Sequence, residues 1–311
     1  MRSSNALIAY WLPTVGIGKK PAIHYVHVPL TEVLNYRRAD GTPQVDVVNL
    51  GGCTFNVAED FDTAPLWFDP VLQTTLQSGA VAQLQGAGIK VLLTIQGSGN
   101  LPGTPMGWES VTPAQLPILL DYINNQILGS DGYNLDGIDV DDEWGPSGPY
   151  LEPTMTALGK SFNGQRMLTQ AVTSGYEVPA DAKPYVSFVN TMVYGDDFCG
   201  LVSGYQSCLD AGFAPGQVTI GVNAGPVAQG GGGFTSVATT EAATAWQPDG
   251  ATKLGMMLWT FSQDIQQFTA NPQNQPDKLY PNADDHSWQA AIIAVMQGEK
   301  VTIPTCEPEA C

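Results

Sequence analysis

A short segment near the middle of the chain is unusually acidic and reads Asp136-Gly-Ile-Asp139-Val-Asp141-Asp142-Glu143-Trp144. In a β-strand successive side chains point to opposite faces, so Asp139, Asp141 and Glu143 would share one face. Three carboxyl groups on one buried face cannot all ionise at low cost, because like charges repel and burial disfavours charge. At least one therefore keeps a proton at working pH. Glu143, at the far end of the segment, is the natural general acid for a departing group.

Other interpretations of this segment fit less well. A solvated acidic turn accounts for the charges but not for the strict alternation with Ile138 and Val140. An EF-hand-like calcium loop needs a central Gly and a Glu further downstream, and neither fits. A two-metal carboxylate site would need additional His or Asp ligands at other strand ends, where they are scarce. We therefore expect no metal and no cofactor.

Short apolar runs alternate with longer helical segments, which indicates βα units and a parallel sheet. The predicted strands are Ala6–Trp11, Val45–Leu50, Lys90–Ile95, Leu135–Val140, Met167–Val172, Phe188–Tyr194, Gln217–Val222 and Leu254–Thr260. Predicted helices include Val71–Gln85, Ala114–Leu128, Met155–Phe162, Thr239–Trp246 and Asp285–Met296. This pattern predicts an α/β protein with one (β/α)8 TIM barrel over residues 1–311. A doubly wound open sheet is the competing architecture, but its Gly-rich first turn is absent.

In such a barrel the functional site lies at the carboxyl ends of the strands. Besides the acidic segment, the predicted strand ends carry Tyr10, Gln96, Tyr194 and Trp259, which are polar or aromatic residues suited to binding sugars. Trp67 and Trp108 could stack on outer sugars, but a role as core or loop anchors is equally open for both.

The acidic segment resembles the signature of glycoside hydrolase family 18, Asp-x-x-Asp-x-Asp-x-Glu on the fourth strand of a (β/α)8 barrel. Asp136, Asp139, Asp141 and Glu143 match its four acids. The resemblance implies that Glu143 is the general acid and then the base, and that Asp141 orients the acetamido group of the substrate. Asp139 would hold or share a proton with Asp141, and Asp136 would be mainly structural.

The same resemblance implies substrate-assisted catalysis, in which the 2-acetamido group of the sugar attacks its own anomeric carbon and no enzyme nucleophile is needed. Tyr194, in a segment similar to the sixth strand of the family, would hydrogen-bond the acetamido oxygen. Trp259, in a segment similar to its eighth strand, would form the floor under that sugar. The full set of candidate substrate-binding residues is Tyr194, Trp259, Asp136, Gln96, Trp144, Tyr10 and Met192.

Two stretches resemble endo-β-N-acetylglucosaminidases of the Endo H type, which cleave the GlcNAc–GlcNAc core of N-glycans. These are the run Asp141-Asp-Glu-Trp144 and an upstream stretch in which Leu66–Leu72 is followed by Ala87–Gly97. The segment ending at Trp259 is closer to chitinases. The expected partners are therefore N-glycans of glycoproteins or, as the alternative, chitin oligosaccharides. A non-catalytic glycan-binding barrel is the third possibility, and the intact set of acids disfavours it.

The chain carries 30 Asp and Glu against 12 Lys and Arg, a net charge of -18, which disfavours binding to nucleic acid or to anionic membranes. No apolar run approaches the roughly 20 residues of a membrane-spanning helix. Among five cysteines, the pairs Cys199/Cys208 and Cys306/Cys311 are close enough to close small loops, although unpaired surface thiols are nearly as plausible. We expect a secreted monomer, although the first residues lack the apolar stretch of a signal peptide.

Overall fold

A computed structural model describes residues 5–17, 24–58, 60–97, 106–142, 149–195, 197–224, 233–266 and 287–306. The strands are β1 (Ala6–Trp11), β2 (Thr14–Ile17), β3 (His24–His27), β4 (Val47–Phe55), β5 (Leu66–Phe68), β6 (Lys90–Gln96), β7 (Gly137–Asp141), β8 (Met167–Val172), β9 (Phe188–Thr191), β10 (Val218–Asn223) and β11 (Gly255–Trp259). The α-helices are α1 (Pro70–Gln77), α2 (Ala80–Gly86), α3 (Leu116–Tyr122), α4 (Leu151–Phe162), α5 (Phe198–Asp210), α6 (Val237–Ala245), α7 (Phe261–Gln266) and α8 (Ser287–Met296).

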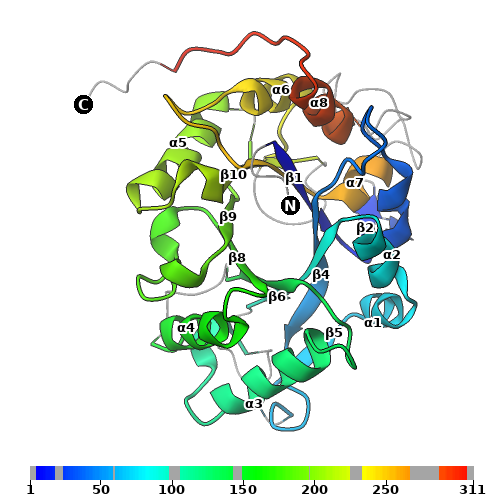
Figure 1. Cartoon of the computed structure of the whole chain (residues 1–311), viewed down its shortest axis with the longest axis vertical. Helices are drawn as coiled ribbons and strands as arrows, with labels where there is room; N and C mark the ends of the chain where they lie inside the picture. The colour runs from blue at the N-terminus through cyan, green and yellow to red at the C-terminus, as the bar shows by residue number, and fades with distance from the viewer. Residues whose placement is uncertain are drawn as a thin grey trace.

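Eight of these strands form a closed parallel barrel. Their order is β1-β11-β10-β9-β8-β7-β6-β4, and pairing of β1 with β4 closes the ring. Figure 1 shows the strands at the centre and the helices around them. The predicted (β/α)8 barrel is thus confirmed, and each of the eight predicted strands overlaps one barrel strand.

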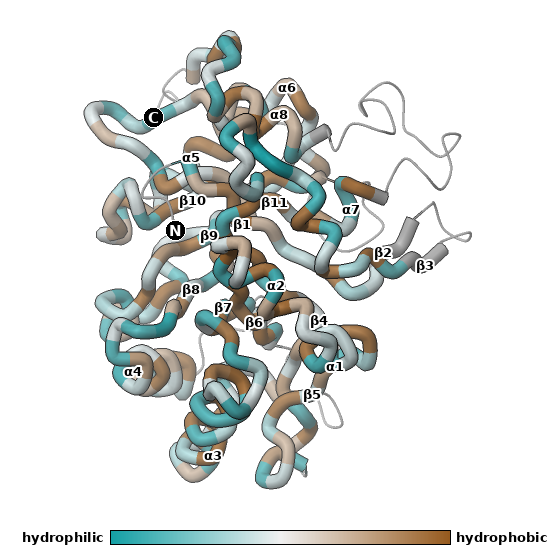
Figure 2. Tube along the Cα trace, turned by 45° about the vertical axis from the view of Figure 1, so that its right-hand side comes forward, coloured by the Kyte–Doolittle hydropathy of each residue, from teal (hydrophilic) through white to brown (hydrophobic). Residues whose placement is uncertain are grey.

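The alternation along each strand separates two hydrophobic cores. The larger core lies between the barrel and its helices and includes Ile138 and Val140 of β7. The smaller one fills the barrel interior and includes Ile8, Leu92 and Met257. Along α3 and α4 the tube in Figure 2 alternates between brown and teal, as expected for helices with one face on the barrel.

Strand β4 extends further than the sequence predicted. The predicted strand ended at Leu50, but the chain passes through Gly51 and Gly52 with a register shift and stays in the sheet to Phe55. Gly52 has φ of +95°, and a Cβ there would lie 3.0 Å from Pro13 Cγ, so glycine suits this bulge. The pairing of β4 with β1 ends at Leu50, and beyond it Cys53–Phe55 of β4 pair with the short antiparallel strand β5.

The helices also differ from the prediction in detail. The predicted helix Val71–Gln85 is two helices, α1 and α2, because Gly79 between them adopts a left-handed φ of +80°. Asp69 accepts hydrogen bonds from the backbone of Val71 and Leu72 and so caps the start of α1. The predictions for α4, α6 and α8 overlap the observed helices, whereas α5 and α7 were not predicted.

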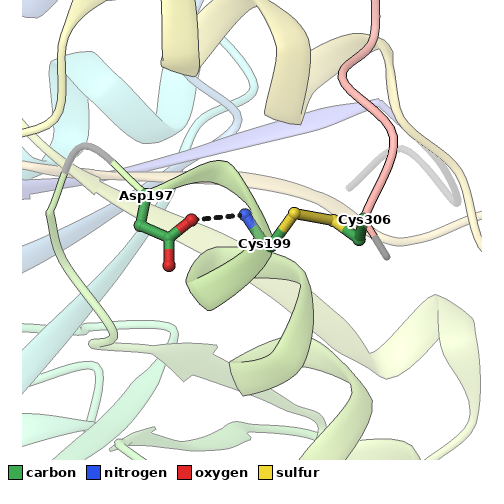
Figure 3. Close-up of a disulfide and its surroundings, with 3 residues drawn as sticks. All are labelled: Asp197, Cys199 and Cys306. Carbon is green, nitrogen blue, oxygen red and sulfur yellow. Dashed lines mark hydrogen bonds between the residues drawn. A yellow bond between two sulfur atoms is a disulfide. The ribbon is translucent and has the colours of Figure 1, made fainter. Parts of the chain in front are cut away.

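A disulfide joins Cys199, in the first turn of α5, to Cys306 near the C-terminus (Figure 3). Asp197 caps the same turn by accepting a hydrogen bond from the backbone of Cys199. The predicted local pair Cys199/Cys208 is therefore wrong, since Cys208 is a buried free thiol, and so is Cys53. The pair Cys306/Cys311 is also wrong, because Cys306 is bonded to Cys199; Cys311 lies outside the described residues.

Across the described ranges, none of the helices combines the length and the apolar character that crossing a membrane requires.

Candidate active site at the carboxyl ends of the barrel strands

Two neighbouring strands bring polar side chains into the barrel. In the register of β6 with β7, Thr94 pairs with Asp139 and Gln96 with Asp141. Ile138 and Val140 occupy the alternate positions of β7 and lie in the core under the helices. The prediction that the acids of this strand face the barrel interior is thus confirmed for Asp139, whose contacts come from three other strands.

Asp139 is fully buried and accepts hydrogen bonds from three hydroxyl groups. Tyr10 Oη on β1 donates to Oδ2 at 2.7 Å, and Thr94 Oγ1 on β6 donates to the same oxygen at 3.1 Å. Thr169 Oγ1 on β8 donates to Oδ1 at 2.5 Å. The carboxyl group is therefore held in one orientation at the centre of the barrel.

Burial raises the pKa of Asp139 to about 6, and the three hydroxyl donors offset part of that rise. Burial, followed by the charges of Asp139 and Asp141, raises the pKa of Tyr10 well above its ordinary range. Tyr10 therefore stays a neutral donor, while Asp139 can gain or lose a proton near pH 6. Such a group can hold or release a proton during catalysis.

The hydrogen-bond network continues behind Tyr10. Asn190 Nδ2 donates to Tyr10 Oη at 3.5 Å, and Thr219 Oγ1 donates to Asn190 Oδ1 at 2.9 Å. Asn190, Thr94 and Thr169 are not among the site residues predicted from the sequence. The alternation of side chains along a strand could have identified such residues. Thr94, for example, precedes Gln96 by two residues on the same strand and therefore shares its inward face.

The aromatic candidates gather around Tyr10. The Trp259 and Tyr10 rings meet edge to face, with centroids 5.2 Å apart and planes at 61°. Tyr194 and Met192 are half-buried and pack, like Trp259, against the core inside the barrel. Tyr10, Met192, Tyr194 and Trp259 thus come together from β1, from the segment after β9 and from β11.

Asp141 ends β7 and is 4% exposed, whereas its neighbour Gln96 is exposed. Together they lie at the end of the barrel where the strands finish. Glu143 and Trp144 follow immediately in the sequence but lie outside the described residues. Their roles as general acid and as a substrate contact stay predictions.

Asp136 lies at the other end of β7. Lys90 Nζ donates to its Oδ1 at 2.7 Å, and Gln85 Nε2 and the Val91 backbone N–H donate to its Oδ2 at 2.9 and 3.0 Å. Because it precedes the first residue of β7, it joins the amino ends of β6 and β7 to α2. These contacts fit the interpretation of Asp136 as a structural residue, and they place it at the end of β7 away from Asp141; its listing among the substrate-binding residues stays a prediction.

The two tryptophans with open roles have different environments. Trp108 is fully buried, and its Nε1 donates to the Ile95 backbone oxygen at 2.9 Å, so it anchors the wall of the barrel. Trp67 on β5 is 48% exposed. Of the two, only Trp67 can contact a ligand.

Among the residues that the structure describes, no cluster of three or more His, Cys, Asp or Glu side chains is placed to hold a metal ion. The described side chains themselves offer acid–base chemistry. Asp139, whose pKa burial raises to about 6, lies below the Asp141 carboxyl group at the strand ends, with aromatic rings beside it. This combination can hold and transfer a proton beside an apolar aromatic surface.

No protein-family model matches this sequence, and no curated protein matches it. Solved structures do share its fold. A fungal endo-β-N-acetylglucosaminidase from glycosyl hydrolase family 18 is 17% identical, with a TM-score of 0.62 over 93% of this chain and 97% of the other. An endo-β-N-acetylglucosaminidase from Cordyceps militaris is 19% identical, with a TM-score of 0.60 over 94% and 91%. A chitinase from Bacteroides thetaiotaomicron is 13% identical, with a TM-score of 0.62 over 95% and 97%. The chain therefore has the barrel fold that family 18 glycoside hydrolases use, across nearly the whole length of each of these proteins.

Proposed function

We propose that this protein is a family 18 glycoside hydrolase that cleaves β-1,4 bonds next to a 2-acetamido sugar with retention of configuration. The observation that carries the proposal is the position of Asp139, fully buried inside the barrel with three hydroxyl donors, within a strand whose acids match the family signature. The shared fold of chitinases and endo-β-N-acetylglucosaminidases supports the same conclusion.

The reaction proceeds in two steps under this proposal. Glu143 gives its proton to the glycosidic oxygen as the bond from that oxygen to C1 breaks, and the acetamido carbonyl oxygen of the same sugar bonds to C1. The product of this step is an oxazolinium ion and a free sugar hydroxyl. The Glu143 carboxylate then takes a proton from water, whose oxygen bonds to C1 as the oxazolinium ring opens. One water is consumed, and Glu143 regains its proton.

The other residues of the site prepare the acetamido group for attack. Asp141 accepts a hydrogen bond from the acetamido N–H, and the carbonyl oxygen becomes more nucleophilic as that proton is drawn away. Asp139, with a pKa of about 6, holds or shares a proton with Asp141. Tyr194 donates to the acetamido oxygen, and Trp259 packs under the sugar ring.

The finer proposal concerns the substrate. We favour the GlcNAc–GlcNAc core of N-glycans, because the run Asp141-Asp-Glu-Trp144 and the upstream stretches Leu66–Leu72 and Ala87–Gly97 resemble the Endo H type. Chitin oligosaccharides are the second candidate, favoured by the segment that ends at Trp259. Proteins of both activities share the fold.

Mass spectrometry of a high-mannose glycoprotein and of chitin oligosaccharides after incubation tests both proposals. Collapse of each glycan to one GlcNAc per site supports the endo-β-N-acetylglucosaminidase, and shortening of the chitin oligomers alone supports the chitinase. Glu143→Gln should abolish turnover while glycan binding stays. Binding with no turnover of any 2-acetamido glycan by the wild type would identify a glycan-binding barrel instead.

A thiazoline analogue of GlcNAc offers a test of the mechanism that is independent of the glycan class. It mimics the oxazolinium ion and cannot be opened in the same way, so it should inhibit competitively. Absence of inhibition at high concentration would exclude substrate assistance while leaving hydrolysis itself open.

We further propose that the protein is secreted and monomeric. The Cys199–Cys306 disulfide supports secretion, because such bonds persist mainly in oxidising compartments. Detection of the protein in culture medium and a light-scattering mass near 33.1 kDa are the expected results.

A further inference from the structure

Trp67 is exposed although its neighbours in β5 are buried. Leu66 and Phe68 pack into the core between the barrel and the helices, while 48% of the Trp67 side chain is open to solvent. A single exposed apolar residue is common on protein surfaces and needs no explanation by itself. The position of Trp67 relative to the candidate active site is what makes it informative.

Pairing across four neighbouring strands connects Trp67 to Asp141. Trp67 on β5 pairs with Thr54 on β4, Thr54 pairs with Gln96 on β6, and Gln96 pairs with Asp141 on β7. Thr54 Oγ1 also donates to the backbone oxygen of Gln96 at 2.8 Å. Figure 1 shows β5 beside β4 at the edge of this part of the barrel. We refer to these four residues as the Trp67 row.

The Trp67 row faces away from the helices. Cys53 and Phe55, on either side of Thr54, point into the core under the helices, and so do Leu66 and Phe68 on either side of Trp67. Because paired residues in neighbouring strands share a face, Trp67 and Thr54 lie on the face that carries Gln96 and Asp141. This is the inward face, which opens to solvent where the strands end.

The length and chemistry of the Trp67 row fit an oligosaccharide. Strands lie about 4.8 Å apart, so the three steps from Asp141 to Trp67 cover roughly 14 Å, which exceeds the width of one pyranose ring. The Gln96 amide can donate and accept hydrogen bonds, and the Thr54 hydroxyl, whose proton goes to the Gln96 backbone oxygen, can still accept one from a sugar hydroxyl. The indole at the end offers a flat apolar face for the C–H face of a pyranose.

We propose that Trp67 forms an outer sugar-binding position, in which an oligosaccharide whose reacting sugar lies at Asp141 stacks a more distant pyranose ring on the indole. This inference rests on the proposed function for the position of the reacting sugar. It predicts that the protein prefers long glycans to short ones and that this preference depends on Trp67.

The test is a comparison of binding affinity between long and short ligands. Calorimetric titrations would use the Glu143→Gln chain, with and without Trp67→Ala, and three probes: N,N′-diacetylchitobiose, the hexamer of GlcNAc and a high-mannose glycan with its two core GlcNAc residues. We expect Trp67→Ala to weaken binding of the hexamer or of the high-mannose glycan about tenfold. Binding of the disaccharide should change less than twofold, and Trp67→Phe should retain most of the affinity for the longer ligand.

Tyr176→Ala is the matched control, since Tyr176 is 68% exposed but lies beside Lys183 and outside the Trp67 row. It should leave all three affinities unchanged. Unaltered affinity for both long ligands in Trp67→Ala would overturn the inference, and so would equal weakening for long and short ligands. If the wild type hydrolyses no 2-acetamido glycan but Trp67→Ala still weakens binding of a long ligand, the proposed function fails and the sugar-binding position stands.

Discussion

Replacing Asp139 by Asn should flatten the dependence of stability on pH. Asp139 has its pKa raised from 3.8 to about 6, chiefly by burial. The folded protein therefore takes up this proton at a higher pH than the unfolded chain does. Between about pH 4 and 6 the unfolded chain binds fewer protons, so the free energy of unfolding falls as pH rises through this window. Asn cannot ionise, and the variant escapes this loss.

The magnitude follows from the two pKa values. One pKa unit corresponds to about 1.4 kcal/mol, so a shift of about two units is worth about 3 kcal/mol. Because part of this change has already occurred at pH 4, the free energy of unfolding of Asp139→Asn, minus that of the wild type, should increase by about 2.4 kcal/mol from pH 4 to pH 7. The hydroxyl partners of Asp139 can donate to the Asn Oδ1 or accept from its two N–H groups, so the fold should persist.

Urea denaturation followed by circular dichroism at constant ionic strength, at pH 4, 5, 6 and 7, measures this difference. Asp249→Asn is the control, because it removes one negative charge at an exposed position and should give a difference that stays nearly constant. A constant difference for Asp139→Asn would refute the reasoning. A difference that decreases with pH would mean that the hydroxyl donors outweigh burial.

Three further predictions concern single contacts. Thr169→Val removes the hydroxyl that donates to Asp139 at 2.5 Å, and should lower the free energy of unfolding by about 1.5–3 kcal/mol at pH 8. At pH 4, where the carboxyl group is neutral, the loss should be smaller. Equal losses at the two pH values would contradict this prediction. Lys253 donates to two backbone carbonyls around the end of α6, and burial lowers its pKa to about 7. Above pH 7, the free energy of unfolding of the wild type should therefore rise, relative to that of Lys253→Met, by up to about 1.4 kcal/mol per pH unit. If the free energies of unfolding of the two proteins change with pH in the same way, the pKa of Lys253 is not lowered. Cys306→Ser removes a disulfide that spans 107 residues, which should lower the free energy of unfolding measured in urea by about 2–5 kcal/mol. A reductant should destabilise the wild type but not the variant.

Much of the barrel follows from local pattern. Each barrel strand carries a short apolar run, because both of its faces pack against hydrophobic neighbours, and such runs are visible without any partner. The inward direction of Asp139 is equally local, since it depends only on the alternation with Ile138 and Val140. The acidic segment therefore revealed both its strand and its face.

Other features depended on residues far apart in the sequence. Cys199 and Cys208 are close along the chain, yet Cys199 bonds to Cys306 because the tertiary fold brings the C-terminal segment to the start of α5. Asp136 and Asp139 belong to the same motif, but they differ in role because one precedes β7 and bonds to Lys90 while the other lies inside the barrel. Spacing along the chain cannot show which groups from other elements lie nearby.

The two tryptophans show the same division between sequence and tertiary structure. By residue type, Trp67 and Trp108 were equally able to be core anchors or sugar contacts. The bulge at Gly51 and Gly52 carries β4 beyond the end of β1, and pairing with that extension is what places Trp67 on an open face. Sequence alone thus determined the strands and the face of the acids. Tertiary structure decided which side chains meet at the site, because burial and pairing are set by distant partners.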